Sequence, residues 1–129
     1  MNMDCNDKKA SPWKRFKSSF RFAFNGLRIA IKEPNFRFHL TAAAVVIIAG
    51  FFFSLSRIEW LFILLMIFGV MALEVINTAI EKTVDLVTKD YQQLAKEAKD
   101  LAAGAVLLFS VLSILVGAII FLPKMFLLF

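Results

Sequence analysis

Three long apolar segments constrain this chain more than any other feature. They cover residues 40–55, the run that begins at Ile58, and residues 101–122. A helix needs about 20 apolar residues to cross the hydrocarbon core of a bilayer, and Phe36 and Phe38 bring the first segment toward that length. With 60% of its 129 residues hydrophobic, the chain is too apolar for one soluble core. The sequence therefore predicts an all-α integral membrane protein with transmembrane helices at about 35–55, 58–88 and 93–122.

The segment 12–32 differs from these spans because it mixes aromatic and basic residues. Ser11 and Pro12 are typical of an N-cap and a first helical position. On a helical wheel the apolar side chains share an arc of about 80°, and the basic ones lie mostly elsewhere. The apolar set is Trp13, Phe16, Phe20, Phe24, Leu27 and Ile31. We expect an amphipathic helix on the membrane surface, preceded by a disordered tail at 1–10. The segment is too charged for a secretory signal.

The placement of lysine and arginine predicts the orientation. Most of them precede the first span or lie between the second and third, against Arg57 alone in the first turn and Lys124 alone after the last span. By the positive-inside rule, the N-terminus and the larger loop are cytoplasmic. The net charge of +5 is better explained by anionic lipid headgroups than by nucleic acid, which we exclude as a partner.

A stripe of polar residues follows the second apolar run, in the stretch EVINTAIEKTVD at 74–85. At about 100° per residue, Asn77, Glu81 and Asp85 lie at about −60°, −20° and +20° from Glu74 on the helical wheel. An ionised carboxylate facing lipid costs at least about 2.5 to 3.5 kcal/mol, so Glu74 must face protein or a water-filled cavity. A three-span chain has few ways to enclose such a cavity alone. We therefore expect a homo-oligomer with the stripe near a subunit interface.

These carboxylates need positive partners, and the candidates are Lys99, the basic surface helix or a bound cation. Mg²⁺ is typically held by one or two carboxylates with substrate phosphates and water, and Glu33 with Glu81 is a plausible pair. Lys99 and Asp100 begin the third span, where a helix N-terminus favours a phosphate. Together these residues suggest phosphoryl transfer. The alternative from spacing alone is that they form solvated salt bridges.

Several familiar motifs are absent from the sequence. It contains no GxxxxGK[ST] and no GxGxxG, so any nucleotide chemistry must use something other than a P-loop or a kinase glycine loop. Cys5 is the one cysteine, which excludes an intrachain disulfide and a CxxC metal spacing. The single histidine, His39, has no partner that the sequence identifies, and such a residue is more often a packing or capping residue than a catalytic one.

The polar residues resemble the prokaryotic diacylglycerol kinase family. The motif that carries the resemblance is Glu74-x-x-Asn77-x-Ala79-Ile80-Glu81-x-x-x-Asp85, then Tyr91, then Ala98-Lys99-Asp100, within a match from about Arg15 to Pro123. The resemblance implies a single membrane kinase domain over 11–129 in the bacterial cytoplasmic (inner) membrane. It also implies a homotrimer with active sites between subunits at the cytoplasmic interface. The implied reaction moves the ATP γ-phosphate to a lipid hydroxyl.

The resemblance also implies roles for individual residues. Glu74 would be the general base, and Glu33 and Glu81 would hold Mg²⁺. Lys99 would contact the ATP phosphates, with Asp100, Tyr91 and Arg15 near the nucleotide. Asn77 would help to order the catalytic carboxylate, and Asp85 is a further supporting residue.

The substrate is predicted from departures within the motif. The branch that resembles diacylglycerol kinase proper reads FRQE after Glu33, whereas this chain has Phe36-Arg37-Phe38-His39, and Phe22 replaces a tyrosine. These residues look like the Gram-positive branch, whose members phosphorylate undecaprenol. The alternatives are a diacylglycerol kinase, a small oligomeric transporter that uses Glu74 as an ion- or proton-coupled site, and a non-catalytic scaffold.

Overall fold

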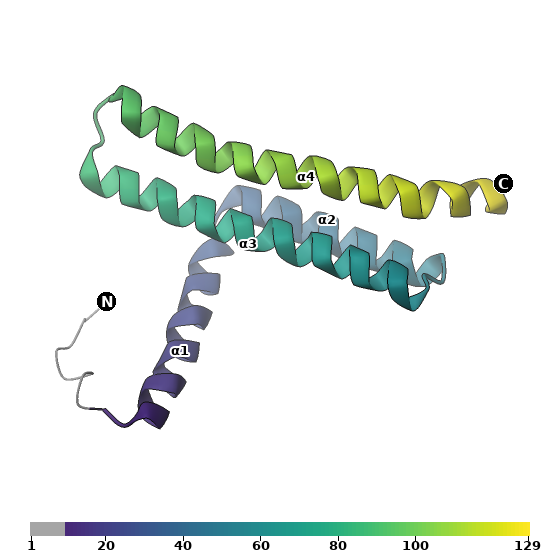
Figure 1. Ribbon diagram of the computed structural model, residues 1–129, viewed down its shortest axis with the longest axis horizontal. Helices are drawn as coiled ribbons and strands as arrows, with labels where there is room; N and C mark the ends of the chain where they lie inside the picture. The colour runs from purple at the N-terminus through teal and green to yellow at the C-terminus, as the bar shows by residue number, and fades with distance from the viewer. Residues whose placement is uncertain (1–9) are drawn as a thin grey trace.

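The computed structural model describes residues 10–129, and this part of the chain is all-helical (Figure 1). The elements in chain order are α1 (Pro12–Ala30), α2 (Pro34–Phe52), α3 (Arg57–Val87) and α4 (Gln93–Leu128). The last three are long and apolar enough to cross a membrane, as the sequence predicted. The tail predicted at 1–10 lies, except for residue 10, outside the described residues.

Helix α1 begins as its sequence indicates. The side chain of Ser11 accepts a hydrogen bond from the backbone N–H of Lys14 at 3.4 Å, and Pro12 needs no partner for an N–H at the first helical position. The helix ends at Ala30, and a short turn leads to Pro34 at the start of α2. In Figure 1, α1 stands away from the other three helices at a steep angle, and it contacts α3 where it joins them.

Helices α2 and α3 form an antiparallel hairpin. Its turn includes Ser54, which adopts a left-handed backbone conformation with φ of 51°. Ser56 then caps α3, because its side chain accepts from the Glu59 backbone N–H while the Glu59 carboxylate accepts from the Ser56 backbone N–H at 2.7 Å. This capping box fixes where α3 starts.

Helix α3 lies between α2 and α4 and is the most buried of the three long helices. Gly69 allows the close approach to α4, since a Cβ built there would lie 2.3 Å from the Phe109 ring. Small residues at helix contacts are the usual means of close packing within a bilayer.

Helix α4 is longer than the apolar run that predicted it, because it continues through Pro123 to Leu128. Lys124 in this last part forms an ion pair of 3.2 Å with Glu59 at the beginning of α3. The pair ties the end of α4 to the hairpin turn.

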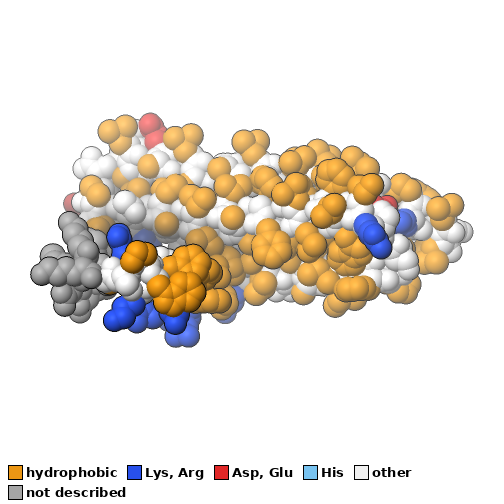
Figure 2. Space-filling view, turned by 60° about the horizontal axis from the view of Figure 1, so that its bottom comes forward, with side chains coloured by type: hydrophobic (Ala, Val, Ile, Leu, Met, Phe, Trp, Pro, Cys, Tyr) orange, Lys and Arg blue, Asp and Glu red, His pale blue; other side chains and the backbone are white. Residues whose placement is uncertain are grey.

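The apolar core and the polar stripe occupy different parts of the bundle. Leu55, Ile63 and Ile120 form the buried cluster near the hairpin turn. Around the bundle, large hydrophobic side chains are exposed on every long helix, and Figure 2 shows them spread over one face. Lysine and arginine gather around α1 in this view, with a smaller group near the opposite end of the bundle. An apolar exterior of this kind suits lipid as the surrounding solvent.

Candidate active site

Glu74 is buried at the middle of α3, with 3% of its surface exposed. Its Oε1 lies 3.1 Å from Nε2 of His39, which comes from the second turn of α2. This carboxylate therefore faces protein, as expected, and the residue that it faces belongs to another helix of the same chain. His39 is partly buried, with 20% of its side chain exposed.

The next turn of α3 carries an amide and a second carboxylate. Asn77 Nδ2 donates a hydrogen bond of 3.1 Å to Oε1 of Glu81, four residues further along. Asn77 is 5% exposed, and its Oδ1 is buried with no hydrogen-bond partner among the described residues. This segment therefore presents an amide oxygen and a carboxylate side by side.

Glu33 lies at the junction of α1 and α2, where it is the N-cap residue of α2. Its Oε1 forms an ion pair of 3.4 Å with Nζ of Lys82 on α3, one residue after Glu81. The structure thus brings Glu33 to the same part of α3 as Glu81, but its recorded partner is the lysine. No cluster of three or more possible metal-ligating side chains is present among residues 10–129.

The far end of the stripe joins α3 to α4. Nζ of Lys99 donates to Oδ1 of Asp85 at 2.6 Å, so this lysine, one of three candidates for neutralising the acidic stripe, neutralises Asp85. The two residues line a polar pocket of about 210 Å³ around the loop between these helices. Lys89, Asp90, Tyr91, Lys96 and Asp100 also line it.

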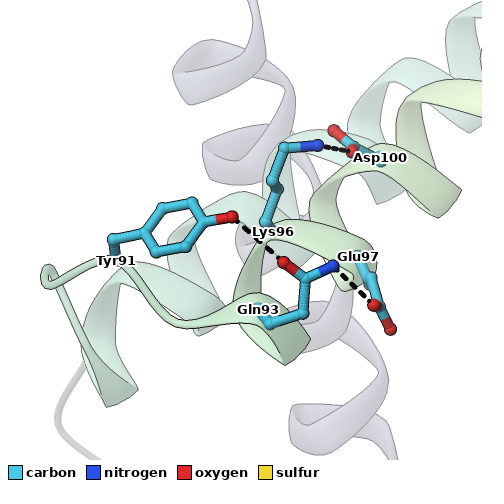
Figure 3. Close-up of polar contacts among 5 residues, drawn as sticks. All are labelled: Tyr91, Gln93, Lys96, Glu97 and Asp100. Carbon is cyan, nitrogen blue, oxygen red and sulfur yellow. Dashed lines mark hydrogen bonds and ion pairs between the residues drawn. The ribbon is translucent and has the colours of Figure 1, made fainter.

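Figure 3 shows the polar contacts beside this pocket. The Tyr91 hydroxyl donates to the side-chain oxygen of Gln93 at 3.0 Å, and the amide of Gln93 donates to Glu97 at 2.8 Å. Asp100 pairs with Lys96, one turn earlier on α4. Tyr91 and Asp100 therefore belong to two separate exposed sets of contacts that lie beside the Lys99–Asp85 pair.

Arg15 is the predicted site residue that the structure places apart from the rest. It lies in the first turn of α1 with its side chain exposed, and no recorded contact within residues 10–129 joins it to the other candidate residues.

A largely apolar groove of about 410 Å³ opens between α2, α3 and α4. Its lining includes Phe38, Val46, Ile67 and Ile114, and His39 contributes one of the few polar groups. The groove does not include Glu74 in its lining, so His39 stands at the boundary between the groove and the buried carboxylate.

His39 is the site residue that sequence reasoning missed. A signal was present, because α2 and α3 are antiparallel and joined by a short turn. Counting equal lengths outward from that turn brings His39 level with Glu74 to within about one helical turn. A buried carboxylate needs a donor, and Arg37 and His39 both lie near that depth on α2, so the count alone does not choose between them.

The arrangement is a buried carboxylate on a membrane helix, followed by oxygen donors and then by a lysine at the water-exposed end. The family model described as prokaryotic diacylglycerol kinase matches residues 21–121. The chain belongs to the prokaryotic diacylglycerol kinase family. It is accordingly a lipid kinase and a multi-pass bacterial membrane protein.

Relatives in this family carry two names. The chain is 50% identical over 124 residues to the undecaprenol kinase of Bacillus subtilis (strain 168). This match covers 95% of the chain and 100% of the relative. It is 42% identical over 109 residues to a diacylglycerol kinase of Synechocystis sp., covering 83% of this chain and 62% of the relative. It is 28% identical over 100 residues to the diacylglycerol kinase of Escherichia coli (strain K12), and the match covers 77% of this chain and 82% of the relative.

Proposed function

We propose that this protein transfers the γ-phosphate of ATP to the hydroxyl of undecaprenol and yields undecaprenyl phosphate. The observation that carries the proposal is the 50% identity with an undecaprenol kinase along that relative's whole length. The buried Glu74 agrees with it, because a base at lipid depth suits a hydroxyl whose lipid chain stays in the bilayer.

Glu74 acts in this proposal as the general base. Its carboxylate accepts the proton of the lipid hydroxyl while the hydroxyl oxygen attacks the γ-phosphorus and ADP leaves. The burial of Glu74 excludes water from this proton transfer. Asn77 orders the polar stripe through its hydrogen bond to Glu81.

The nucleotide binds at the water-exposed end of α3 and α4. Lys99 contacts the ATP phosphates as a point charge and exchanges its present partner, Asp85, for them. Asp85 holds the lysine in place before ATP arrives, and Asp100, Tyr91 and Arg15 bind near the nucleotide. The pocket of about 210 Å³ that Asp85, Tyr91, Lys99 and Asp100 line supports this location.

The donor set fits Mg²⁺. Glu81 and Glu33 are hard oxygen ligands, and the buried Oδ1 of Asn77 is an additional oxygen with no partner among the described residues. Mg²⁺ needs only one or two carboxylates when substrate phosphates and water complete its shell, so a larger cluster is not required. Glu33 and Glu81 would hold the ion, which neutralises phosphate charge when bound.

The proposed membrane placement is the cytoplasmic membrane, with the N-terminus and the active site on the cytoplasmic side. The steep angle between α1 and the bundle would lay α1 in the membrane plane, with its aromatic residues toward lipid and its basic residues toward headgroups. The family resemblance adds a homotrimer in which neighbouring subunits complete each site. The polar stripe at the side of α3 agrees with such an assembly.

The substrate preference is supported by the character of the groove beside His39. Its lining is largely apolar, which suits a polyprenyl chain that ends in one hydroxyl better than a glycerol backbone with several polar groups. A diacylglycerol substrate is the alternative within the family.

The test is transfer of label from γ-labelled ATP to undecaprenol and to diacylglycerol, in parallel, by purified protein in mixed micelles. We expect labelling of undecaprenol that requires Mg²⁺ and is nearly abolished in Glu74→Gln. A preference for diacylglycerol would overturn the substrate and keep the family chemistry. No label in either lipid, from a folded oligomer, would favour the transporter that uses Glu74 or the scaffold.

A further inference from the structure

The contact between His39 and Glu74 joins two helices through the most buried carboxylate of the described chain. The side chain of Glu74 is 4% exposed, and His39 is the one side chain within residues 10–129 recorded as its polar partner. A carboxylate in so apolar a setting is unfavourable when ionised unless a donor compensates it. His39 is therefore the one polar side chain of the described residues that faces this buried carboxylate.

The histidine is held in a defined orientation. Its Nε2 points to Glu74 at 3.1 Å, and its ring meets the Phe38 ring edge to face at 5.5 Å between centroids. Both aromatic residues line the apolar groove. His39 therefore borders the groove while one of its nitrogens is directed at the carboxylate.

The chemistry of this contact does not depend on the charge of the imidazole. With its proton on Nε2, a neutral imidazole places an N–H donor 3.1 Å from Oε1 of Glu74, and an imidazolium adds a positive charge to the same contact. In either form the donor stabilises the ionised carboxylate. The contact also restrains Oε1, which limits rotation of the carboxyl group and so the directions open to its second oxygen.

We propose that His39 is a positioning residue that holds one oxygen of Glu74 and so directs its second oxygen toward the lipid hydroxyl. The inference rests on the proposed function. In the transfer step the hydroxyl O–H bond breaks and its proton goes to the second oxygen of Glu74. The hydroxyl oxygen forms the new bond to the γ-phosphorus, the bond from that phosphorus to the β,γ-bridging oxygen breaks, and ADP leaves. His39 keeps its own proton throughout.

Three substitutions separate this role from simple packing. His39→Leu removes the donor. His39→Gln keeps an N–H as many bonds from Cβ as the histidine Nε2, and His39→Asn keeps the same amide group but is too short to reach Glu74. Thr41→Val is the matched control on α2, because the Thr41 hydroxyl bonds only to the Arg37 carbonyl of its own helix.

We expect His39→Leu to lower kcat for undecaprenol phosphorylation by about 10- to 100-fold, the factor that one hydrogen bond to a charged group supplies. KM for ATP should change little, because His39 does not line the pocket proposed for the nucleotide. His39→Gln should recover most of kcat, His39→Asn should stay near His39→Leu, and Thr41→Val should match the unchanged protein. Size-exclusion profiles and thermal unfolding of each variant report folding separately.

Two results would overturn the positioning role while leaving the kinase function intact. One is a His39→Leu enzyme with unchanged kcat. The other is a folded His39→Gln enzyme as slow as His39→Asn, since reach would then not matter. If His39→Leu does not fold, the comparison of the two amides still decides. An unchanged protein that phosphorylates no lipid would overturn the proposed function, and this role with it.

Discussion

The close approach of α3 and α4 at Gly69 leads to a sharp prediction about stability. The perturbation is Gly69→Ala, which adds one methyl group at a point where a Cβ would lie 2.3 Å from Cε1 and Cζ of Phe109. Normal carbon contacts are about 3.5 to 4.0 Å, so the ring or the helix must shift by more than about 1 Å.

The magnitude follows from two opposing effects. Overpacking a close contact costs about 1 to 3 kcal/mol. Replacing glycine by alanine inside a helix returns up to about 1 kcal/mol of helix propensity. Gly104 on α4 has no atom within 4 Å of an added Cβ, so Gly104→Ala keeps the gain without the clash. The free energies of unfolding of the two variants should therefore differ by about 1 to 3 kcal/mol, with Gly69→Ala the less stable.

The assay measures unfolding of the purified protein in one detergent, with the helical circular dichroism signal as the readout. Unfolding is induced by increasing denaturing detergent and, in a parallel experiment, by temperature. A double variant, Gly69→Ala with Phe109→Leu, removes most of the ring that the new methyl group meets. It should lose less stability than the two single changes added together. Equal stability of Gly69→Ala and Gly104→Ala would refute the packing described between α3 and α4.

The remaining predictions concern activity, all measured as label transfer to undecaprenol. Glu74→Gln should lower kcat by about 10²- to 10⁴-fold, the usual contribution of a general base, with the size-exclusion profile unchanged; near-normal turnover would remove it from that role. Glu81→Gln should lower activity and raise the Mg²⁺ concentration needed for half-maximal rate, and an unchanged Mg²⁺ titration would exclude it as a ligand. Lys99→Met should raise KM for ATP by about 10-fold or more, since a charge-assisted contact is lost, while KM for undecaprenol stays the same. Lys124→Met, at the opposite end of the bundle, should leave both KM values unchanged, and a loss of ATP affinity there would contradict the location of the nucleotide site.

The helices were predictable because their signals are local. Ser11 with Pro12 and Ser56 with Glu59 start helices in the structure through contacts that span only a few residues, and the apolar runs marked the three long helices. The end of α4 was less predictable. Pro123 lacks an N–H but is tolerated within the helix, which continues to Leu128.

The candidate site was predictable where its residues share one helix. The hydrogen bond from Asn77 to Glu81 follows from their spacing of four residues on α3. Contacts between helices depend on rotation and depth, which sequence spacing does not fix. The pairing of Glu33 with Lys82 and of Glu74 with His39 therefore emerged only from the structure. Lys99 was a candidate partner for the stripe from charge alone, and the structure selects Asp85 for it.

The length of α3 has a consequence for how the membrane itself acts on this protein. Its 31 residues make a rod of about 46 Å, against a hydrocarbon core of about 30 Å. Glu74 and Asp85 lie on the same rod about 16 Å apart along its axis, so the spacing between the proposed base and the nucleotide pocket is fixed. The depth of a lipid hydroxyl, in contrast, moves with the thickness of the bilayer. Because the helix is rigid and the bilayer is deformable, we expect the turnover of this protein to change with bilayer thickness.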